Sequence, residues 1–114
     1  MINRLMIAGF GGQGVMMIGK LIGQCAMEQD LNATFFPSYG AEQRGGTANC
    51  TVIQSDRMIG SPTSGRLDVL CALNQPSMVD FLPRLRPGGT LLVNSSIVDV
   101  SAVDRDDIQI VQVL

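Results

Sequence analysis

A glycine-rich turn near the start of the chain is the first segment whose residue spacing is typical of a ligand-binding motif. Residues 9–14 read GFGGQG, the G-x-G-x-x-G spacing that lets backbone N–H groups approach the pyrophosphate of a dinucleotide at the start of a helix. A dinucleotide site also needs Asp or Glu at the end of the second strand to hold the ribose hydroxyls. That strand ends in FFPS at residues 35–38, so the fingerprint for NAD or FAD is incomplete.

Two interpretations of this turn remain. In the first, its backbone amides bind a phosphate or another anion at the helix start. In the second, the glycines serve only to make a tight turn from strand to helix. The residues that would bind the anion are Gly11, Gly12, Gln13 and Gly14.

A long polar segment is the second candidate. It reads PSYGAEQRGGTANC at residues 37–50, and a loop of this length between strands is uncommon unless it binds something. Its centre combines a fixed cation, flexible backbone amides and a hydroxyl, which suits an anion or a docking partner. The alternative is a solvated loop whose arginine pairs with a nearby glutamate or with nothing. The candidate residues are Arg44, Gly45, Gly46 and Thr47.

Small polar residues follow three further predicted strands. In an open α/β sheet, ligands bind beyond the carboxyl ends of the strands, where loops and helix starts converge. We therefore expect hydrogen-bonding groups at this edge, none of which is a strong base. They are Ser38, Asn74, Asn94 and Ser95.

Residue types that are missing or scattered narrow the chemistry further. The sequence has no histidine, which excludes Ser-His and Cys-His nucleophile pairs and histidine metal sites within this chain. Its three cysteines, Cys25, Cys50 and Cys71, form no C-x-x-C motif. We expect them to be three buried free thiols in a reducing cytoplasm, and we expect neither a metal site nor a catalytic residue in this chain alone.

Charge and hydropathy exclude two classes of partner. The net charge is -2, the pI is about 4.8 and Lys20 is the only lysine, so nucleic acid is a poor candidate. The apolar stretch at the N-terminus is interrupted by glycine and ends at Lys20, short of the ~18 apolar residues that would span a bilayer. We therefore predict no signal peptide and no membrane helix, and a cytoplasmic location.

Apolar periodicity predicts the elements that would position these groups. Helical spacing predicts a helix over residues 13–29, in which Gly19 and Gly23 would allow close approach to a sheet, and a second helix from Pro76 through Leu85. The motif at residues 87–89, Pro-Gly-Gly, would close the second helix. Short apolar or β-branched runs predict strands at residues 5–8, 33–36 (stopped by Pro37), 50–54, 68–73, 90–93 and 108–114, with residues 57–59 as a returning hairpin arm.

This order of elements predicts an α/β fold, a three-layer α/β/α Rossmann-like domain with a mostly parallel, mixed sheet and one antiparallel hairpin. A length of 114 residues suits a single domain spanning residues 1–114. Because the sequence ends within a predicted strand, we expect this domain to lack C-terminal helices and one face of its sheet to be poorly covered.

The segment LRPGGTLLVNSS at residues 85–96 raises a separate alternative. A helix, Pro-Gly-Gly and a strand in that order also occur late in methyltransferases that use S-adenosylmethionine. Those enzymes need an acidic residue after the second strand to hold a ribose, and this sequence has none there, which argues against a methyltransferase.

Five segments, in order along nearly the whole chain, resemble one family. They are GFGGQGV, PSYGAEQRGGTANC, the SP of GSPTS, ALNQPS and PGGTLLVNSS. Together they resemble the gamma subunit of the 2-oxoacid:ferredoxin oxidoreductases, and most of all the 2-oxoglutarate members. The second segment is far more specific than the glycines alone.

The resemblance implies a single gamma-type (pyruvate/ketoisovalerate oxidoreductase catalytic-like) domain in a hetero-oligomeric enzyme. That enzyme converts a 2-oxoacid, coenzyme A and oxidised ferredoxin to acyl-CoA, carbon dioxide and reduced ferredoxin. The family's thiamine diphosphate is held by alpha and beta subunits and its iron-sulfur clusters by cysteine-rich, ferredoxin-like partners, with ferredoxin as the acceptor.

Coenzyme A is a candidate ligand of this chain, because its phosphates would suit the turn at residues 11–14 and the loop around Arg44. The alternative function is a free-standing Rossmann-like nucleotide-binding or scaffolding module with no link to 2-oxoacids.

Overall fold

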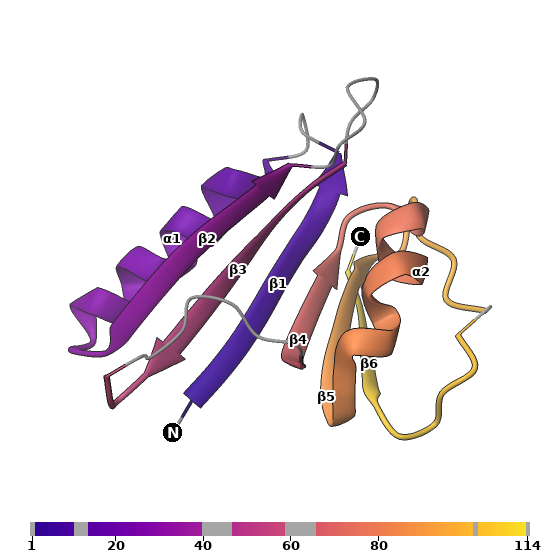
Figure 1. Cartoon of the computed structure of the whole chain (residues 1–114). Coiled ribbons are helices and arrows are strands. Elements are labelled where there is room, and N and C mark those ends of the chain that lie inside the picture. Colours follow the sequence, from indigo (N-terminus) through magenta and orange to yellow (C-terminus); the bar gives the residue numbers. More distant parts are fainter. Residues whose placement is uncertain (1, 11–13, 40–46, 59–65, 102, 114) are drawn as a thin grey trace.

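The computed structural model describes residues 2–10, 14–39, 47–58, 66–101 and 103–113. Six strands, two α-helices and one short 3₁₀ helix alternate along this part of the chain (Figure 1). In order they are β1 (Ile2–Phe10), α1 (Val15–Glu28), β2 (Asn32–Tyr39), β3 (Thr47–Ser55), β4 (Leu67–Ala72), α2 (Gln75–Phe81), η2 (Leu82–Arg84), β5 (Leu85–Asn94) and β6 (Gln109–Val113).

The strands form one mixed sheet in the order β2-β3-β1-β4-β5-β6. Strands β1, β4, β5 and β6 pair in parallel, whereas β3 lies antiparallel between β1 and β2. The α/β fold with a mostly parallel, mixed sheet is therefore confirmed. The antiparallel pairing differs from the expected hairpin of residues 50–54 and 57–59, because β3 pairs with β1 and with β2 instead.

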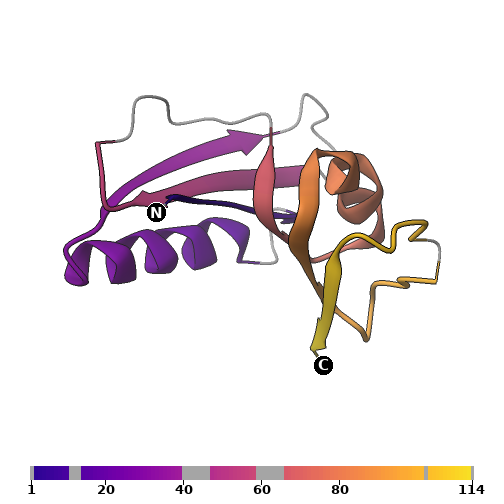
Figure 2. The same cartoon turned by 90° about the horizontal axis from the view of Figure 1, so that it is seen from below.

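The two helices lie on opposite faces of the sheet and cover different halves of it (Figure 2). Helix α1 packs on β1, β2 and β3, over a core of Ile7, Val15, Cys50 and Val52. Helix α2 packs on the other face, over a larger core drawn from β1, β4 and β5 that includes Met6, Leu70, Met78, Leu91 and Val93. Alternate residues of β1 thus enter both cores, as the two-residue period of a strand requires.

One glycine sets how close α1 lies to the sheet. A Cβ added at Gly19 would collide with Cys50 Sγ and would lie 2.8 Å from Cε1 of Phe35. At Gly23, one turn later, an added Cβ would meet nothing within 4 Å. The predicted close approach is confirmed at Gly19 and is wrong at Gly23.

Asn74 caps the start of helix α2, and its Oδ1 accepts a hydrogen bond of 2.9 Å from the N–H of Ser77. Pro76 lies in the first turn, where a missing backbone donor costs nothing. The helix ends at Phe81, and Leu85 already belongs to β5, so the predicted extent of this helix is wrong at its C-terminal end.

The Pro-Gly-Gly motif lies inside β5 instead of closing a helix. Gly88 has a φ of 82°, which favours glycine, and its N–H donates a hydrogen bond of 2.6 Å to the carbonyl of Asp107. This contact ties the start of β5 to the segment that leads into β6.

Three other predictions also need correction. Strand β2 continues through Pro37 to Tyr39, because β2 is the outermost strand and proline is tolerated at a sheet edge. Arg57 and Met58 form no strand, and Ile59 lies outside the described residues. Cys25 is exposed, whereas Cys50 is buried and Cys71 is half-buried.

Neither α1 nor α2 is long enough to cross a lipid bilayer, and the described residues contain no other α-helix.

Gly19→Ala should lower the free energy of unfolding by roughly 1–3 kcal/mol, because Cys50 and Phe35 must shift to admit the methyl group. Gly23→Ala is the matched control on the same helix face, and it should be neutral or stabilising by up to about 1 kcal/mol through helix propensity. Urea unfolding monitored by circular dichroism measures both. Equal effects of the two substitutions would contradict the packing described for α1.

Alkaline pH should destabilise the fold through Cys50. Burial raises the pKa of its thiol from 9.0 to about 11, and the thiol donates a hydrogen bond of 3.5 Å to the carbonyl of Val15. The folded state holds this proton more tightly than the unfolded state, so the stabilisation is complete below about pH 9 and is lost as the pH rises towards 11.

The expected loss is of order 1–3 kcal/mol, measured by urea unfolding from pH 8 to 11. Cys50→Ala should remove this component, whereas the exposed control Cys25→Ala should keep it. Burial also raises the pKa of Cys71, so part of the pH dependence should remain in both variants. An unchanged pH dependence in Cys50→Ala would refute the assignment.

Candidate functional site

The carboxyl ends of β1, β2, β4 and β5 and the start of β3 all lie at one edge of the sheet, the upper edge in Figure 1. The register places Phe10 opposite Thr47, and Tyr39 opposite Ala48. The chain therefore leaves β1 and β2, and enters β3, at adjacent positions of this edge. The glycine turn and the polar loop predicted from the sequence are both anchored there.

The structure tests the candidate residues of these two segments only in part. Gly11, Gly12, Gln13, Arg44, Gly45 and Gly46 lie outside the described residues. Ser38 and Thr47 are placed by their backbone, in β2 and β3, at the end of each strand that faces this edge. Ligand binding by these eight residues stays a prediction.

Gly14 is the described end of the glycine turn. It is the N-cap of α1 with a φ of 81°, a left-handed conformation that side chains disfavour by about 1–2 kcal/mol. Its carbonyl accepts a hydrogen bond of 3.0 Å from the N–H of Ile18. Gly14 thus places the amino end of a 14-residue helix, whose first amides have no partner within the helix, at the edge where β1 ends.

Asn74, which follows β4, has a structural role in the fold. Its side chain is 5% exposed, and its Oδ1 caps α2 through the N–H of Ser77. The backbone N–H of the preceding Leu73 donates a hydrogen bond of 2.8 Å to Ala8 in β1, which fixes this turn against the central strand. Ligand binding by Asn74 remains a prediction alongside this structural role.

Asn94 and Ser95, after β5, shape the turn in which they lie. Oδ1 of Asn94 accepts a hydrogen bond of 2.9 Å from the N–H of Ser96. The N–H of Ser95 donates to the carbonyl of Val113 at 2.8 Å, and its Oγ lies 3.5 Å from the same oxygen. These contacts join the ends of β5 and β6, and a ligand contact by either side chain is untested.

The thiols of Cys50 and Cys71 are poor nucleophiles in this arrangement, since burial raises the pKa of both and keeps them protonated near neutral pH. Among the residues that the structure describes, no group of three Cys, Asp or Glu side chains is arranged to hold a metal ion. Among the described residues, the groups at this edge that could bind a ligand are backbone amides, side-chain amides and hydroxyls.

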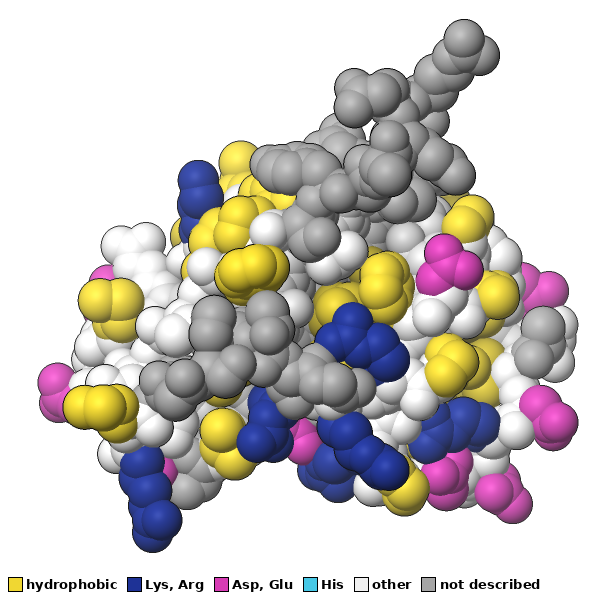
Figure 3. All heavy atoms as spheres, viewed as in Figure 1, with side chains coloured by type: hydrophobic (Ala, Val, Ile, Leu, Met, Phe, Trp, Pro, Cys, Tyr) yellow, Lys and Arg dark blue, Asp and Glu magenta, His cyan; other side chains and the backbone are white. Residues whose placement is uncertain are grey.

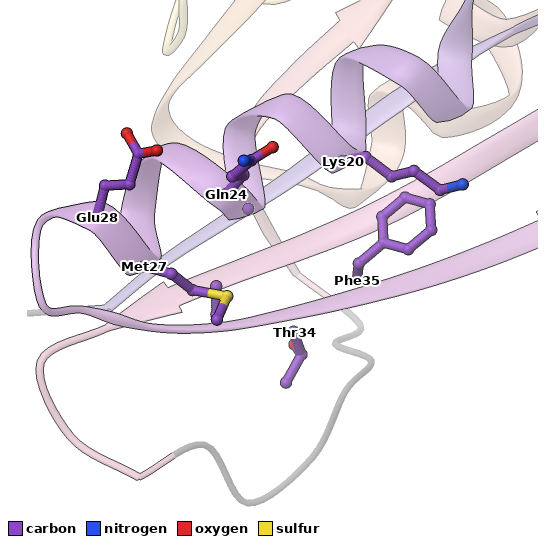
Figure 4. Close-up of a pocket in the computed structure, with 8 residues that line it drawn as sticks. Lys20, Gln24, Met27, Glu28, Thr34 and Phe35 are labelled. Atoms are coloured by element: carbon purple, nitrogen blue, oxygen red, sulfur yellow. The ribbon is translucent and has the colours of Figure 1, made fainter.

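A groove between α1 and β2 was not predicted from the sequence. It encloses about 450 Å³ and is lined by Lys20, Gly23, Gln24, Met27, Glu28, Ala33, Thr34 and Phe35. In Figure 4, Met27 extends from α1 towards β2, and Phe35 lies beside the Lys20 side chain. The open space at Gly23 is part of this groove, which explains why that glycine has no packing role.

Arginines gather at the opposite end of the sheet, along the lower edge in Figure 3. A hollow of about 360 Å³ there is lined by Arg66, Arg84 and Arg105 together with Pro83, Leu85 and Pro87. Arg105 is held by the carbonyls of Leu82 and Leu85, at 3.0 and 2.7 Å. The arginines are far apart in the sequence, so only the fold could bring them together.

Asp68 organises the neighbouring part of that edge. Its carboxylate pairs with the guanidinium of Arg86 and accepts a hydrogen bond of 2.7 Å from the backbone N–H of Arg4. This ion pair links the starts of β1, β4 and β5, away from the edge where the candidate residues lie.

Comparison with known proteins places the chain in a family. The pattern of the family described as pyruvate ferredoxin/flavodoxin oxidoreductase matches residues 4–113. The ketoisovalerate oxidoreductase subunit VorA of Methanothermobacter marburgensis is 44% identical over 98 residues, which are 86% of this chain and 20% of VorA. The 2-oxoglutarate synthase subunit KorC of the same organism is 38% identical over 97 residues, 84% of this chain and 52% of KorC.

A solved structure agrees with these relatives. The keto/oxoacid ferredoxin oxidoreductase gamma subunit from Geobacter sulfurreducens superposes with a TM-score of 0.78 and 31% identity, over 96% of this chain and 60% of that subunit. The chain thus spans about half the length of KorC and a fifth of VorA. Because the family pattern covers almost every residue, the chain belongs to the pyruvate ferredoxin/flavodoxin oxidoreductase family.

Proposed function

We propose that this chain acts as the gamma subunit, without a catalytic residue of its own, of a 2-oxoacid:ferredoxin oxidoreductase. Its partners would be alpha and beta subunits that hold thiamine diphosphate and a ferredoxin-like subunit that holds iron-sulfur clusters. The observation that carries the proposal is the family match over residues 4–113, together with the gamma-subunit fold of the Geobacter protein.

The chemistry of the chain supports a binding role. The sequence has no histidine, and burial raises the pKa of the Cys50 and Cys71 thiols, so these two thiols are poorly suited to proton transfer or nucleophilic attack. The edge where β1 and β2 end instead anchors two segments rich in backbone amides, one of which contains Arg44. Such an edge is suited to holding part of a substrate while a partner performs the chemistry.

The 2-oxoacid itself has two candidates. The sequence segments favour 2-oxoglutarate, whereas the higher identity to VorA favours the branched-chain substrate ketoisovalerate. Because the cofactor that attacks the oxoacid would sit in the partner subunits, the specificity would be decided there. We therefore propose the reaction class for this chain and treat the two oxoacids as alternatives for one assay.

Coenzyme A is the ligand that we propose for the edge. Its phosphates would be held by the amides of residues 11–14 at the start of α1 and by the guanidinium of Arg44. The register of β1, β2 and β3 supports this placement, since it anchors both segments at neighbouring positions. A cytoplasmic location would follow from the need for ferredoxin and coenzyme A.

The subunit proposal is tested by tagging the chain at its N-terminus in native cells and isolating it under mild conditions. We expect co-purification with a thiamine diphosphate-binding subunit and an iron-sulfur subunit, identified by mass spectrometry. The complex should reduce ferredoxin when supplied with coenzyme A and either 2-oxoglutarate or ketoisovalerate. A stable monomer that binds a nucleotide with no partner would favour the free-standing module instead.

The coenzyme A proposal is tested by calorimetry on the assembled complex. Arg44→Ala should weaken coenzyme A binding about 10- to 100-fold through loss of a charge-assisted contact, and Gly12→Asp should weaken it by placing a carboxylate against the phosphates.

Two matched controls lie at the opposite edge, after β3. Arg57→Ala keeps the backbone N–H that bonds Ser55 Oγ at 3.0 Å, and Met58→Asp adds a carboxylate at a side chain that is 92% exposed. Both should leave the affinity unchanged. Unaltered affinity in Arg44→Ala and Gly12→Asp would exclude coenzyme A from this edge while leaving the subunit proposal to the isolation experiment.

A further inference from the structure

Strand β2 has an outer edge beside the groove that separates it from α1. It is an outermost strand of the sheet and, in the part of the chain that the structure describes, pairs on one side only, with β3 (Figure 1). Its sequence, NATFFPSY, contains no charged side chain of the kind that commonly protects such an edge from another strand. The backbone groups on its outer side can therefore accept a further strand.

The register of the sheet identifies these outward backbone groups, because successive residues of a strand direct them to opposite sides. The carbonyl of Ala8 accepts a hydrogen bond of 2.8 Å from Leu73, which follows β4, so the even-numbered residues of β1 face β4 and the odd-numbered ones face β3. Followed through the pairs of β1 with β3 and of β3 with β2, the same alternation turns the even-numbered residues of β2 towards β3. Ala33, Phe35 and Pro37 therefore face outward, which also suits a proline in an edge strand.

The outward N–H groups allow one register for pairing with a second copy of β2. Between residues 31 and 37 they belong to Ala33 and Phe35, because Pro37 has none and the N–H of Leu31 already donates to the carbonyl of Ala26 at 3.0 Å. In an antiparallel pair of copies, both are used when Ala33 of each copy lies opposite Phe35 of the other. Each of these two positions then exchanges both of its backbone hydrogen bonds.

Thr34 lies on the two-fold axis of this register, opposite Thr34 of the second copy. Its Oγ1 is buried and has no hydrogen-bond partner among the described residues. A buried hydroxyl without a partner destabilises a fold, and threonines that face each other on neighbouring strands hydrogen-bond to one another. A second copy would thus supply the missing partner.

The groove between α1 and β2 carries the charges that a two-fold pair requires. In Figure 4, Lys20 lies beside Phe35, whereas Glu28 lies at the other end of the groove, where the chain turns from α1 into β2. The pairing places Phe35 of one copy opposite Ala33 of the other. Lys20 of each copy thereby approaches Glu28 of the other, so the same attractive contact forms twice, as in an isologous interface.

We propose that two copies of this chain pair through β2, so that the sheet continues from one copy into the other. The pairing uses the outward N–H groups, gives the Thr34 hydroxyl a partner, sets Lys20 against Glu28 and covers Met27, which is 65% exposed beside the groove. Because the strands run antiparallel, the edges at which β1 and β2 end point in opposite directions in the two copies. The dimer does not depend on the proposed function.

Sedimentation velocity of the purified chain tests the pairing, and we expect a dimer. Ala33→Pro removes an outward N–H and leaves the bonds between β2 and β3 in place, so the chain should still fold, as circular dichroism can verify. It should weaken the dimer by about tenfold or more, because the N–H is lost from both copies. Ala33→Ser, which keeps the N–H, is the matched control and should dimerise as the parent does.

Charge reversal tests the contact between Lys20 and Glu28. Lys20→Glu and Glu28→Lys each place like charges together in a dimer of one variant, so each variant alone should dimerise less than the parent. An equal mixture of the two variants restores opposite charges at both contacts and should form a heterodimer, detected by pull-down on a tag carried by one of them. Recovery on mixing distinguishes a contact between copies from an effect within one copy.

A disulfide tests the register. In a Cys25→Ser background, which removes the exposed thiol, Thr34→Cys should link two copies under mild oxidation. Residues opposite each other in a non-hydrogen-bonded pair have Cα atoms about 4.5 Å apart, within the range of disulfides. Phe36→Cys in the same background is the control, because position 36 lies opposite Asn32 of the other copy and should not link.

Four outcomes would overturn the proposal. The chain stays monomeric at every concentration, its dimer survives Ala33→Pro unchanged, the mixture of charge variants associates no better than either alone, or Thr34→Cys in the isolated complex forms its disulfide with a different polypeptide. The last outcome would assign the edge of β2 to a strand of a partner subunit.

Discussion

Strand β1 is the element on which the rest of the structure depends, because it joins the antiparallel part of the sheet to the parallel part. It pairs with antiparallel β3 over its full length and with parallel β4 from Leu5 to Ala8. Its odd-numbered Ile7 enters the α1-side core, and its even-numbered Met6 and Ala8 enter the α2-side core. A slip of one residue in this strand would exchange the two cores, so β1 fixes both layers at once.

The pairing of β1 also determines the position of the candidate site. With β3 antiparallel between β1 and β2, the segment that joins β2 to β3 returns at the same edge at which β1 ends. Helix α1 follows β1 directly, and Gly19 lets it lie close enough to the sheet for its amino end to be held at that edge. Asp68 and the arginines occupy the opposite edge, so the two ends of the molecule differ in chemistry.

The sequence predicted those parts of the fold in which local pattern and tertiary packing agree. The apolar run at residues 5–8, the helical spacing at Val15 and Ala26, and the apolar runs of β4 and β5 all encode burial directly. The predictions at Pro37 and Pro87 were wrong because proline was taken as the end of an element. Pro37 is accommodated in β2 by its position in an edge strand, and Pro87 is accommodated in β5 beside Gly88, which has a positive φ. The prediction that Cys25 is buried was wrong for a similar reason, since its neighbours in the helix are apolar but Cys25 itself is exposed.

For the candidate site, the sequence predicted at which edge of the sheet the residues lie, but not which hydrogen bonds they make. Strand order alone identified where Asn74, Asn94 and Ser95 would lie, but it could not show that Asn74 caps α2 or that Ser95 bonds the end of β6. Those contacts involve partners that depend on tertiary structure. The arginine hollow depends entirely on the fold, because Arg66, Arg84 and Arg105 share no local signal.

We propose that the edge where β1 and β2 end faces the catalytic partner subunits of the complex. Site-specific photocrosslinking in the assembled complex tests it most directly, with a benzophenone amino acid placed at Ser96 on that edge or at Met58 on the opposite one, both exposed. We expect crosslinks from position 96 to the thiamine diphosphate-binding subunit and none to it from position 58. Crosslinks to that subunit from position 58 alone would contradict this orientation of the chain.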